Sequence, residues 1–145
     1  MVAVNYLAIL VCGFVAMGLG TLWYGPLFGQ AWMKGAGISP DAMEKMKADP
    51  KMKQKMMRSY GIMFIGSLLT AFVLAHSLVF ASTYMQISGV MAGFEAAIWN
   101  WLGFVAPVTI GMVLWEQKTV KYWLIVSGYS LVYLLICGTI LALWV

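Results

Sequence analysis

Charged residues are absent from four long stretches of this chain of 145 residues. No Lys, Arg, Asp or Glu occurs within residues 1–33, 59–94, 96–115 or 122–145. A helix that crosses the hydrocarbon interior of a membrane needs about 20 mostly apolar residues. The pattern therefore predicts an all-α integral membrane four-helix bundle, with spans at residues 4–24, 60–82, 93–115 and 122–144. The stretches lack the period-2 alternation of membrane barrel strands, and a lone helix satisfies its own backbone hydrogen bonds in lipid.

The segment between the first two spans contains two signals for the start of a helix. Ser39 before Pro40 is typical of an N-cap followed by the first helical residue. Asp49 before Pro50 repeats the signal, and the helix that begins there is expected to continue without a break into the second span. A short amphipathic helical segment is therefore predicted between the first and second spans.

Two other prolines predict where a span ends or bends. Gly25 and Pro26 follow the first span, and glycine followed by proline commonly ends a helix. Pro107 lies inside the third span, where its missing N–H group predicts a kink.

The composition agrees with a single transmembrane domain over residues 1–145. Hydrophobic residues make up 63% of the chain, which has only nine Lys or Arg and five Asp or Glu. Water-soluble domains average about 45–50% apolar and about 25% charged residues. The composition excludes a typical water-soluble domain, and it also excludes a disordered chain, which needs low hydrophobicity and high net charge.

All nine basic residues fall in the first and third loops, and the second loop has none. They are Lys34, Lys45, Lys47, Lys51, Lys53, Lys55 and Arg58 in the first loop and Lys118 and Lys121 in the third. Short loops rich in Lys and Arg lie on the cytoplasmic side. Both loops are therefore predicted to be cytoplasmic, with both chain termini outside.

The most basic stretch surrounds the start of the second span, with methionines between the charges. Its basic residues are Lys51, Lys53, Lys55 and Arg58. We expect them to contact anionic lipids at the cytoplasmic face, which explains the net charge of +4 without nucleic acid as a partner. Methionine thioethers also select Cu(I). Because lysines repel a cation, the pattern favours lipid, and no metal site is predicted.

Small residues at helical spacing predict where the helices pack. Lipid provides no hydrophobic driving force between helices, so small residues mark the contact faces. The candidates are Ala8, Cys12, Ala16 and Gly20 on the first span and Gly93 and Gly103 on the third. Packing within the bundle is the favoured interpretation, and assembly of a homo-oligomer is the other. Cys12 and Cys137 are expected to be free thiols that could be neighbours.

Four polar residues in the spans are the candidate binding residues: Asn5, His76, Glu95 and Asn100. Polar groups at membrane depth are costly and often functional. The predicted topology puts all four in the outer half of the membrane, so one hypothesis is a shared pocket centred on His76. In the alternative, Asn5 caps a helix, Glu95 lies in the first turn of the third span, and His76 bonds to a carbonyl group of a neighbouring helix.

The usual signatures of enzymes are missing from the sequence. There is one His and only two Cys, and no phosphate loop or dinucleotide fingerprint occurs. We therefore expect no cofactor. The first functional hypothesis is a small-molecule or ion transport or channel component that works as an oligomer. The alternatives are a non-catalytic partner or lipid-interacting protein, and a membrane enzyme with a bound cofactor.

Short motifs over nearly the whole chain carry a resemblance to a known family. They are Asn5, the run Leu22-Trp23-Tyr24-Gly25-Pro26-Leu27-Phe28-Gly29 with Trp32-Met33, His76, Trp101-Leu102-Gly103-Phe104, Gly128-Tyr129, Gly138 and Ala142-Leu143-Trp144. Together they resemble the bacterial domain-of-unknown-function family 1761. The resemblance implies a small four-helix protein of the bacterial cytoplasmic membrane, and it implies no particular function.

Overall fold

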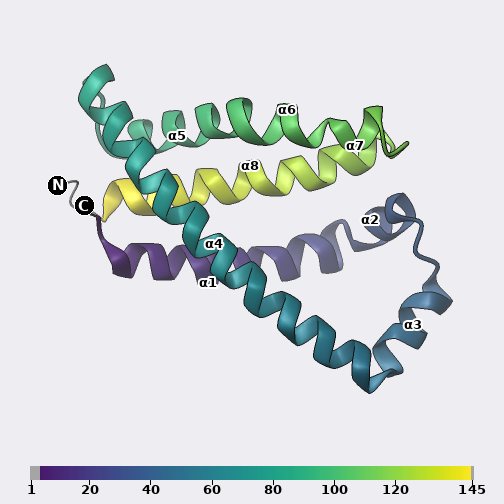
Figure 1. The fold of residues 1–145 in the computed structure, drawn as a ribbon. Coiled ribbons are helices and arrows are strands. Elements are labelled where there is room, and N and C mark those ends of the chain that lie inside the picture. The colour runs from purple at the N-terminus through teal and green to yellow at the C-terminus, as the bar shows by residue number, and fades with distance from the viewer. Residues whose placement is uncertain (1–3, 145) are drawn as a thin grey trace.

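The computed structural model describes residues 4–144 and shows them as helices joined by short connections (Figure 1). The elements are α1 (Tyr6–Leu22), the π-helical segment η1 (Trp23–Leu27), α2 (Gly29–Ala36), α3 (Pro40–Ala48), α4 (Pro50–Met85), α5 (Gly89–Asn100), the π-helical segment η2 (Trp101–Val105), α6 (Ala106–Thr109), α7 (Gly111–Leu114) and α8 (Val120–Leu143). Four stretches are long and apolar enough to cross a membrane: Tyr6–Leu27, Pro50–Met85, Gly89–Leu114 and Val120–Leu143. The all-α class and the four candidate spans are thus confirmed, and they suggest a multi-pass membrane protein.

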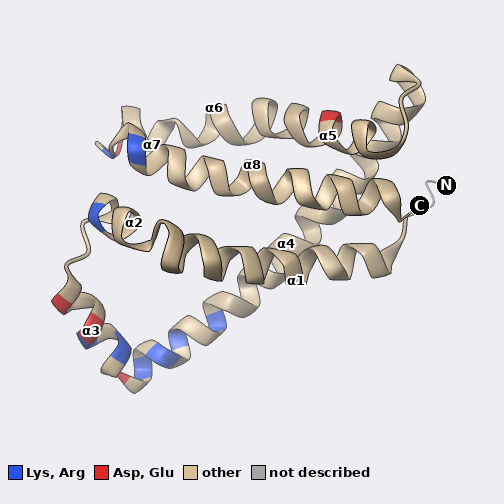
Figure 2. Cartoon of the chain, turned by 180° about the vertical axis from the view of Figure 1, so that it is seen from behind, with Lys and Arg blue, Asp and Glu red and all other residues tan. Residues whose placement is uncertain are grey.

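Three of the spans form a layer that the fourth crosses. Helix α8 lies between α1 and the run from α5 to α7, and α4 crosses this layer obliquely on one face (Figure 1). The view from behind shows the same three helices side by side, with α4 on the far side (Figure 2). Helix α4 has 36 residues, which at 1.5 Å per residue is longer than the roughly 30 Å hydrocarbon core of a membrane.

Only the second half of α4 packs closely against the layer. Its buried residues are Ser67, Ala71, Leu74, Ala75 and Leu78, and small residues at four-residue spacing allow a neighbouring helix to approach. The first half lacks such a face, and every residue from 53 to 63 is exposed. The helices therefore diverge toward the start of α4.

The predicted helix starts in the first loop are confirmed. The Ser39 hydroxyl accepts a hydrogen bond of 3.2 Å from the backbone N–H of Ala42. The Asp49 carboxylate accepts one of 2.9 Å from the backbone N–H of Lys51. Each satisfies a donor that the first turn of a helix leaves free, and α4 then runs without a break to Met85.

The predicted interruption of the first helix at Gly25 and Pro26 is confirmed as a kink. Helix α1 ends at Leu22, and within η1, which contains Pro26, Gly25 lies outside helical geometry at φ −100° and ψ −105°. In the third span η2 directly precedes α6, which has Pro107 in its first turn. Because proline has no N–H to donate, a wider turn accommodates the missing bond. The predicted disruption at Pro107 is confirmed as a break into short segments.

Two tryptophans tie the flanking helices of the layer to α8. The indole N–H of Trp23 donates to the carbonyl oxygen of Ile125 at 2.9 Å. The indole N–H of Trp101 donates to the carbonyl oxygen of Ser127 at 2.8 Å. Each tryptophan is the first residue of a π-helical segment, so both irregular turns are fixed to α8 two residues apart.

Small residues bring the backbones of the layer together. Cys12 and Cys137 are fully buried free cysteines, and each Sγ lies 4.0 Å from the carbonyl oxygen of the other residue. The two are therefore neighbours between α1 and α8. Gly93 of α5 meets Gly138 of α8 backbone to backbone, and a Cβ atom on either would collide with the other's carbonyl group.

We predict that Gly93→Ala destabilises the protein, because the added methyl group would force two backbones apart. Overpacking of this kind costs about 1–3 kcal/mol. The free energy of unfolding, measured by denaturant titration in micelles, should fall by that amount. Gly103→Ala is the matched control in the same span, since a Cβ atom there meets nothing within 4 Å. Equal stability of the two variants would contradict the packing role of Gly93.

Candidate ligand-binding site

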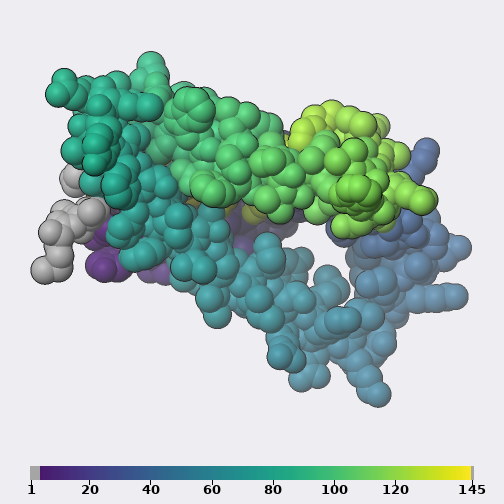
Figure 3. All heavy atoms as spheres, turned by 45° about the horizontal axis from the view of Figure 1, so that its top comes forward, coloured from purple at the N-terminus to yellow at the C-terminus, as the bar shows by residue number. Residues whose placement is uncertain are grey.

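The divergence of α4 leaves a cavity between this helix and the layer. Its volume is about 650 Å³, within the range of roughly 300–1,000 Å³ that small-molecule sites occupy. Figure 3 shows the surface hollowed between α4 and the helices of the layer. The cavity is largely apolar, and its polar lining residues are Ser67, Thr70, Asn100, Tyr129, Ser130 and Tyr133.

Two tyrosines of α8 form the polar wall of the cavity. The Tyr133 hydroxyl donates a hydrogen bond of 2.8 Å to the carbonyl oxygen of Ser67 on α4. The Tyr129 hydroxyl donates one of 3.0 Å to the carbonyl oxygen of Ala16 on α1. The two rings are stacked, with centroids 6.4 Å apart and planes 7° apart. This wall therefore connects three helices and has fixed ring positions.

Aromatic packing supports the same wall from the side of η1. The Tyr24 ring lies 5.3 Å from that of Tyr129, measured between centroids, and the Trp23 ring lies 6.3 Å from it. Tyr24 also contacts Trp32 of α2 at 5.6 Å. Aromatic pairs at such distances are favourable in tilted or edge-on geometry. The π-helical segment η1 thus holds the rings that pack behind the cavity.

The remaining hydroxyl groups of the lining bond to their own helices. Each donates to a carbonyl oxygen one turn earlier: Ser67 to Phe64 at 2.7 Å, Thr70 to Gly66 at 3.0 Å and Ser130 to Val126 at 3.4 Å. Such bonds satisfy a hydroxyl proton inside a membrane helix at little cost.

Asn100 is the one amide of the lining. Its side-chain nitrogen donates to the carbonyl oxygen of Ala96 at 2.8 Å, and its Oδ1 accepts from the Ser77 hydroxyl at 3.4 Å. None of the residues found to line the cavity, among those the structure describes, carries a charge. The site is therefore neutral, with a small set of fixed polar groups.

The four candidate binding residues do not meet in one pocket. Asn100 lines the main cavity. Asn5 lines a separate cavity of about 390 Å³ at the end of the layer where the termini meet. His76 and Glu95 line neither of these two cavities, as far as residues 4–144 show.

Asn5 and His76 have structural partners. The Asn5 side chain accepts from the backbone N–H groups of Leu7 and Ala8 at 3.0 and 3.2 Å, so it caps α1 as the alternative interpretation expected. It also donates to the carbonyl oxygen of Trp144 at 2.9 Å, which joins the start of α1 to the end of α8. The Nδ1 atom of His76 lies 2.9 Å from the carbonyl oxygen of Phe72. This carbonyl group belongs to the same helix, so the expected bond to a neighbouring helix was wrong.

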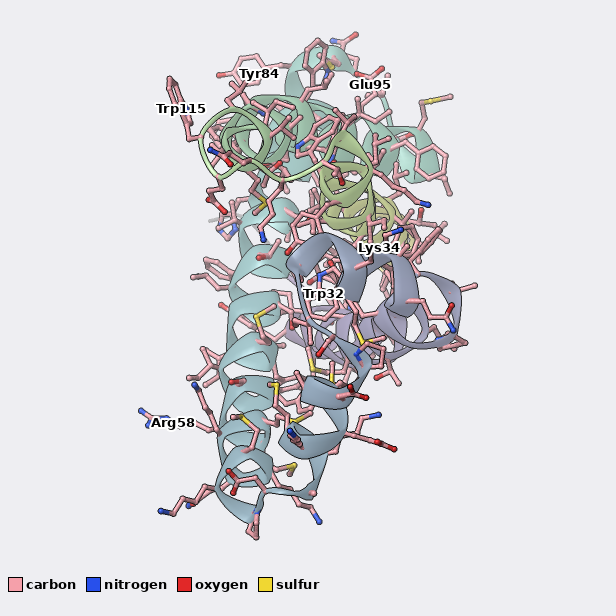
Figure 4. All side chains as sticks on the ribbon, turned by 90° about the vertical axis from the view of Figure 1, so that its right-hand side faces the viewer. Trp32, Lys34, Arg58, Tyr84, Glu95 and Trp115 are labelled. Carbon is pink, nitrogen blue, oxygen red and sulfur yellow. The ribbon has the colours of Figure 1, made fainter. Side chains whose placement is uncertain are left out.

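Glu95 does not lie in the first turn of the third span, where the sequence predicted it. Helix α5 begins at Gly89, four residues before the predicted start of the span, so Glu95 belongs to its second turn. The side chain is half-buried and lies on the outer edge of the layer (Figure 4). The boundary was misplaced because Ser88 and Gly89 interrupt an apolar stretch without adding charge.

The predicted packing residues fall into two groups. Ala8, Cys12 and Ala16 are buried in the core, and Gly20 faces the Tyr129 hydroxyl, which a Cβ atom would meet at 3.5 Å. Gly93 packs on Gly138 as described above. Gly103 differs, because it is exposed and has open space around it in this chain.

Sequence reasoning missed the tyrosines and the tryptophans of the site. Tyr129 and Tyr133 are four residues apart in an otherwise apolar span, and this spacing puts both hydroxyl groups on one face of a helix. Trp23 and Trp101 were noted only as parts of the family motifs, although buried indole N–H groups usually find an acceptor.

The family model described as "Protein of unknown function (DUF1761)" matches residues 7–142. This chain belongs to the DUF1761 family. The match confirms the resemblance found in the sequence, and Trp23, Trp101, Tyr129 and Tyr133 all lie within the matched region. No curated protein matches the chain, and no solved structure does either.

We predict that Tyr133→Phe lowers stability, because it removes the hydrogen bond that connects α8 to α4. Hydrogen bonds between membrane helices average about 0.6 kcal/mol and reach about 1.7 kcal/mol. The loss should appear in the free energy of unfolding in micelles. Tyr84→Phe serves as control, since Tyr84 is 80% exposed. If both variants lose the same stability, the Tyr133 bond makes no specific contribution.

Proposed function

We propose that this DUF1761 protein binds a neutral lipid in the cavity between α4 and the layer. The observation that carries the proposal is the lining, which combines apolar residues, a few fixed hydroxyl groups and no charge among the described residues. The lining residues of α4 lie between positions 63 and 74, well inside an apolar span. A molecule that enters from the bilayer therefore reaches this cavity without crossing water.

The absence of a counter-charge supports a neutral ligand. Moving an unpaired carboxylate or ammonium group into an apolar environment costs many kcal/mol. The lining also has no His, Lys, Asp or Glu within the described chain, so its Ser, Thr and Tyr hydroxyl groups have no general base beside them to activate them as nucleophiles. The cavity thus favours binding over catalysis.

The first hypothesis from the sequence, a small-molecule or ion transport or channel component, is less favoured in a proton-linked form. That form requires a titratable group on the pathway, and His76 bonds to its own helix while Glu95 lies at the edge of the layer. The lipid-interacting alternative fits the geometry better. Assembly as a homo-oligomer in the bacterial cytoplasmic membrane stays part of the proposal.

The experiment is photo-crosslinking in lipid nanodiscs with a monoacylglycerol that carries a diazirine in its chain. We expect labelled peptides from α4 and α8 around the cavity. Gly66→Phe should reduce labelling about tenfold or more, because Gly66 lines the cavity and has open space for a larger side chain.

Gly61→Phe is the matched control for this experiment. Gly61 lies on the same helix with equally open surroundings, and it does not line the cavity. Unchanged labelling of the Gly66→Phe protein, or labelling spread evenly over lipid-exposed helices, would refute the proposal.

We also propose that the segment from α3 to the start of α4 faces the cytoplasm, with both termini outside, and contacts anionic lipid headgroups. Figure 2 shows the basic residues gathered on this segment and near α2 and α7. Lys51, Lys53, Lys55 and Arg58 are all exposed. Exposed basic groups near an anionic membrane surface contribute about 1 kcal/mol each.

We predict that replacing these four residues by Gln reduces the number of phosphatidylglycerol molecules that remain bound to the purified protein. Native mass spectrometry counts them directly. Each lost charge should weaken binding, and the loss should be smaller at high salt because screening already weakens the attraction. A variant with Arg in place of the three lysines keeps the charge and should retain the lipid. Equal lipid retention by the Gln variant would contradict the surface role.

A further inference from the structure

The polar groups of the cavity have almost no hydrogen-bond donors left to offer. A Ser, Thr or Tyr hydroxyl group has one proton to donate and oxygen lone pairs to accept with. The lining has five hydroxyl groups, and each donates its proton to a backbone carbonyl oxygen. The donors are Ser67, Thr70, Tyr129, Ser130 and Tyr133. What they present to a ligand is therefore the acceptor side of each oxygen.

These hydroxyl-to-carbonyl hydrogen bonds are stable inside a membrane. A hydroxyl proton turned away from its carbonyl group leaves two polar atoms unpaired, and no water is present in lipid to replace the bond. The Tyr129 and Tyr133 bonds also hold separate helices together, so turning these hydroxyl groups would weaken the fold. A ligand that needs donors would have to break such bonds.

Asn100 is the exception, because its side chain has both a free donor and a free acceptor. One of its two amide protons bonds to Ala96, which leaves a single donor for the cavity. Its Oδ1 accepts from Ser77 at 3.4 Å, and a carbonyl oxygen has a second lone pair. The whole lining thus has one free donor against many free acceptors.

We infer that the ligand is a neutral lipid with a free hydroxyl headgroup, such as a long-chain alcohol. This inference rests on the proposed function. The hydroxyl proton of the ligand supplies the hydrogen-bond donor that the lining lacks, and the hydrocarbon chain packs against the apolar residues of the cavity. An amine or a carboxylic acid would carry a charge at neutral pH, and the cavity has no partner for it. Esters and ethers have only hydrogen-bond acceptors, and these would face the acceptor oxygens of the lining without forming a bond.

The test compares a long-chain alcohol with its methyl ether as competitors of the diazirine monoacylglycerol. The two competitors share the chain and the oxygen, and only the alcohol can donate. One lost hydrogen bond lowers affinity by about tenfold, so we expect the alcohol to compete at about one tenth of the ether concentration. Equal competition by both would overturn the inference and leave the proposed function standing. No competition by either, together with unlocalised labelling, would overturn both.

Variants identify the acceptors. Thr70→Val removes a lining hydroxyl group with little change in shape and should reduce the preference for the alcohol, while affinity for the ether is retained. Thr139→Val is the matched control, because Thr139 makes the same bond to its own helix, at 2.8 Å to Leu135, and does not line the cavity. Ser130→Ala repeats the test on α8. An undiminished preference in both lining variants would contradict the assignment.

Discussion

The close approach of helix backbones along α8 is the contact on which the rest of the structure depends. In lipid, apolar side chains gain nothing by leaving one hydrocarbon environment for another, so helices associate where small residues allow tight packing. Gly138 meets Gly93 of α5, and Cys137, its neighbour in sequence, meets Cys12 of α1. Two consecutive residues of α8 thus hold both flanking helices, and this makes α8 the centre of the layer.

Hydrogen bonds to backbone carbonyl groups then set the register of the helices around this centre. Trp23 and Trp101 bond to α8 from either side, and Tyr133 bonds from α8 to α4. The π-helical turns at η1 and η2 accommodate the nearby prolines and aim the two indoles at α8. The irregular parts of the backbone are therefore positioning elements for the layer.

The cavity follows from where this packing stops. The buried small residues of helix α4 begin only at Ser67, so the part of the helix before it is free to diverge and a space opens between α4 and the layer. Tyr129 and Tyr133 line this space and also bond one helix to another, while Ser67, Thr70 and Ser130 bond within their own helices. The protons of all five hydroxyl groups are used in these bonds, so the hydrogen-bonding character of the cavity follows from the fold.

Much of the fold was predictable from residues alone. Helix starts at Ser39 and Asp49, the break near Pro107 and the burial of Ala8, Cys12 and Ala16 all depend on local chemistry or on helical spacing. The candidate site was predicted less well, since only Asn100 of the four polar candidates lines the main cavity. His76 bonds to its own helix, and Asn5 caps its own helix and bonds to Trp144 of α8. The polarity of a residue in the sequence does not reveal whether its side chain bonds to a neighbour or lines a cavity.

The sequence by itself determined the four apolar spans, the basic loops between them and the places where small residues recur, because charge, length and spacing act along the chain. Only the tertiary structure decided that α8 is central, that α4 crosses the layer and diverges, and that Tyr129 and Tyr133 face a cavity. The physical reason is that these features depend on which small faces meet and which carbonyl groups accept hydrogen bonds. Such pairings join residues far apart in the chain, as Trp101 with Ser127 and Cys12 with Cys137 show.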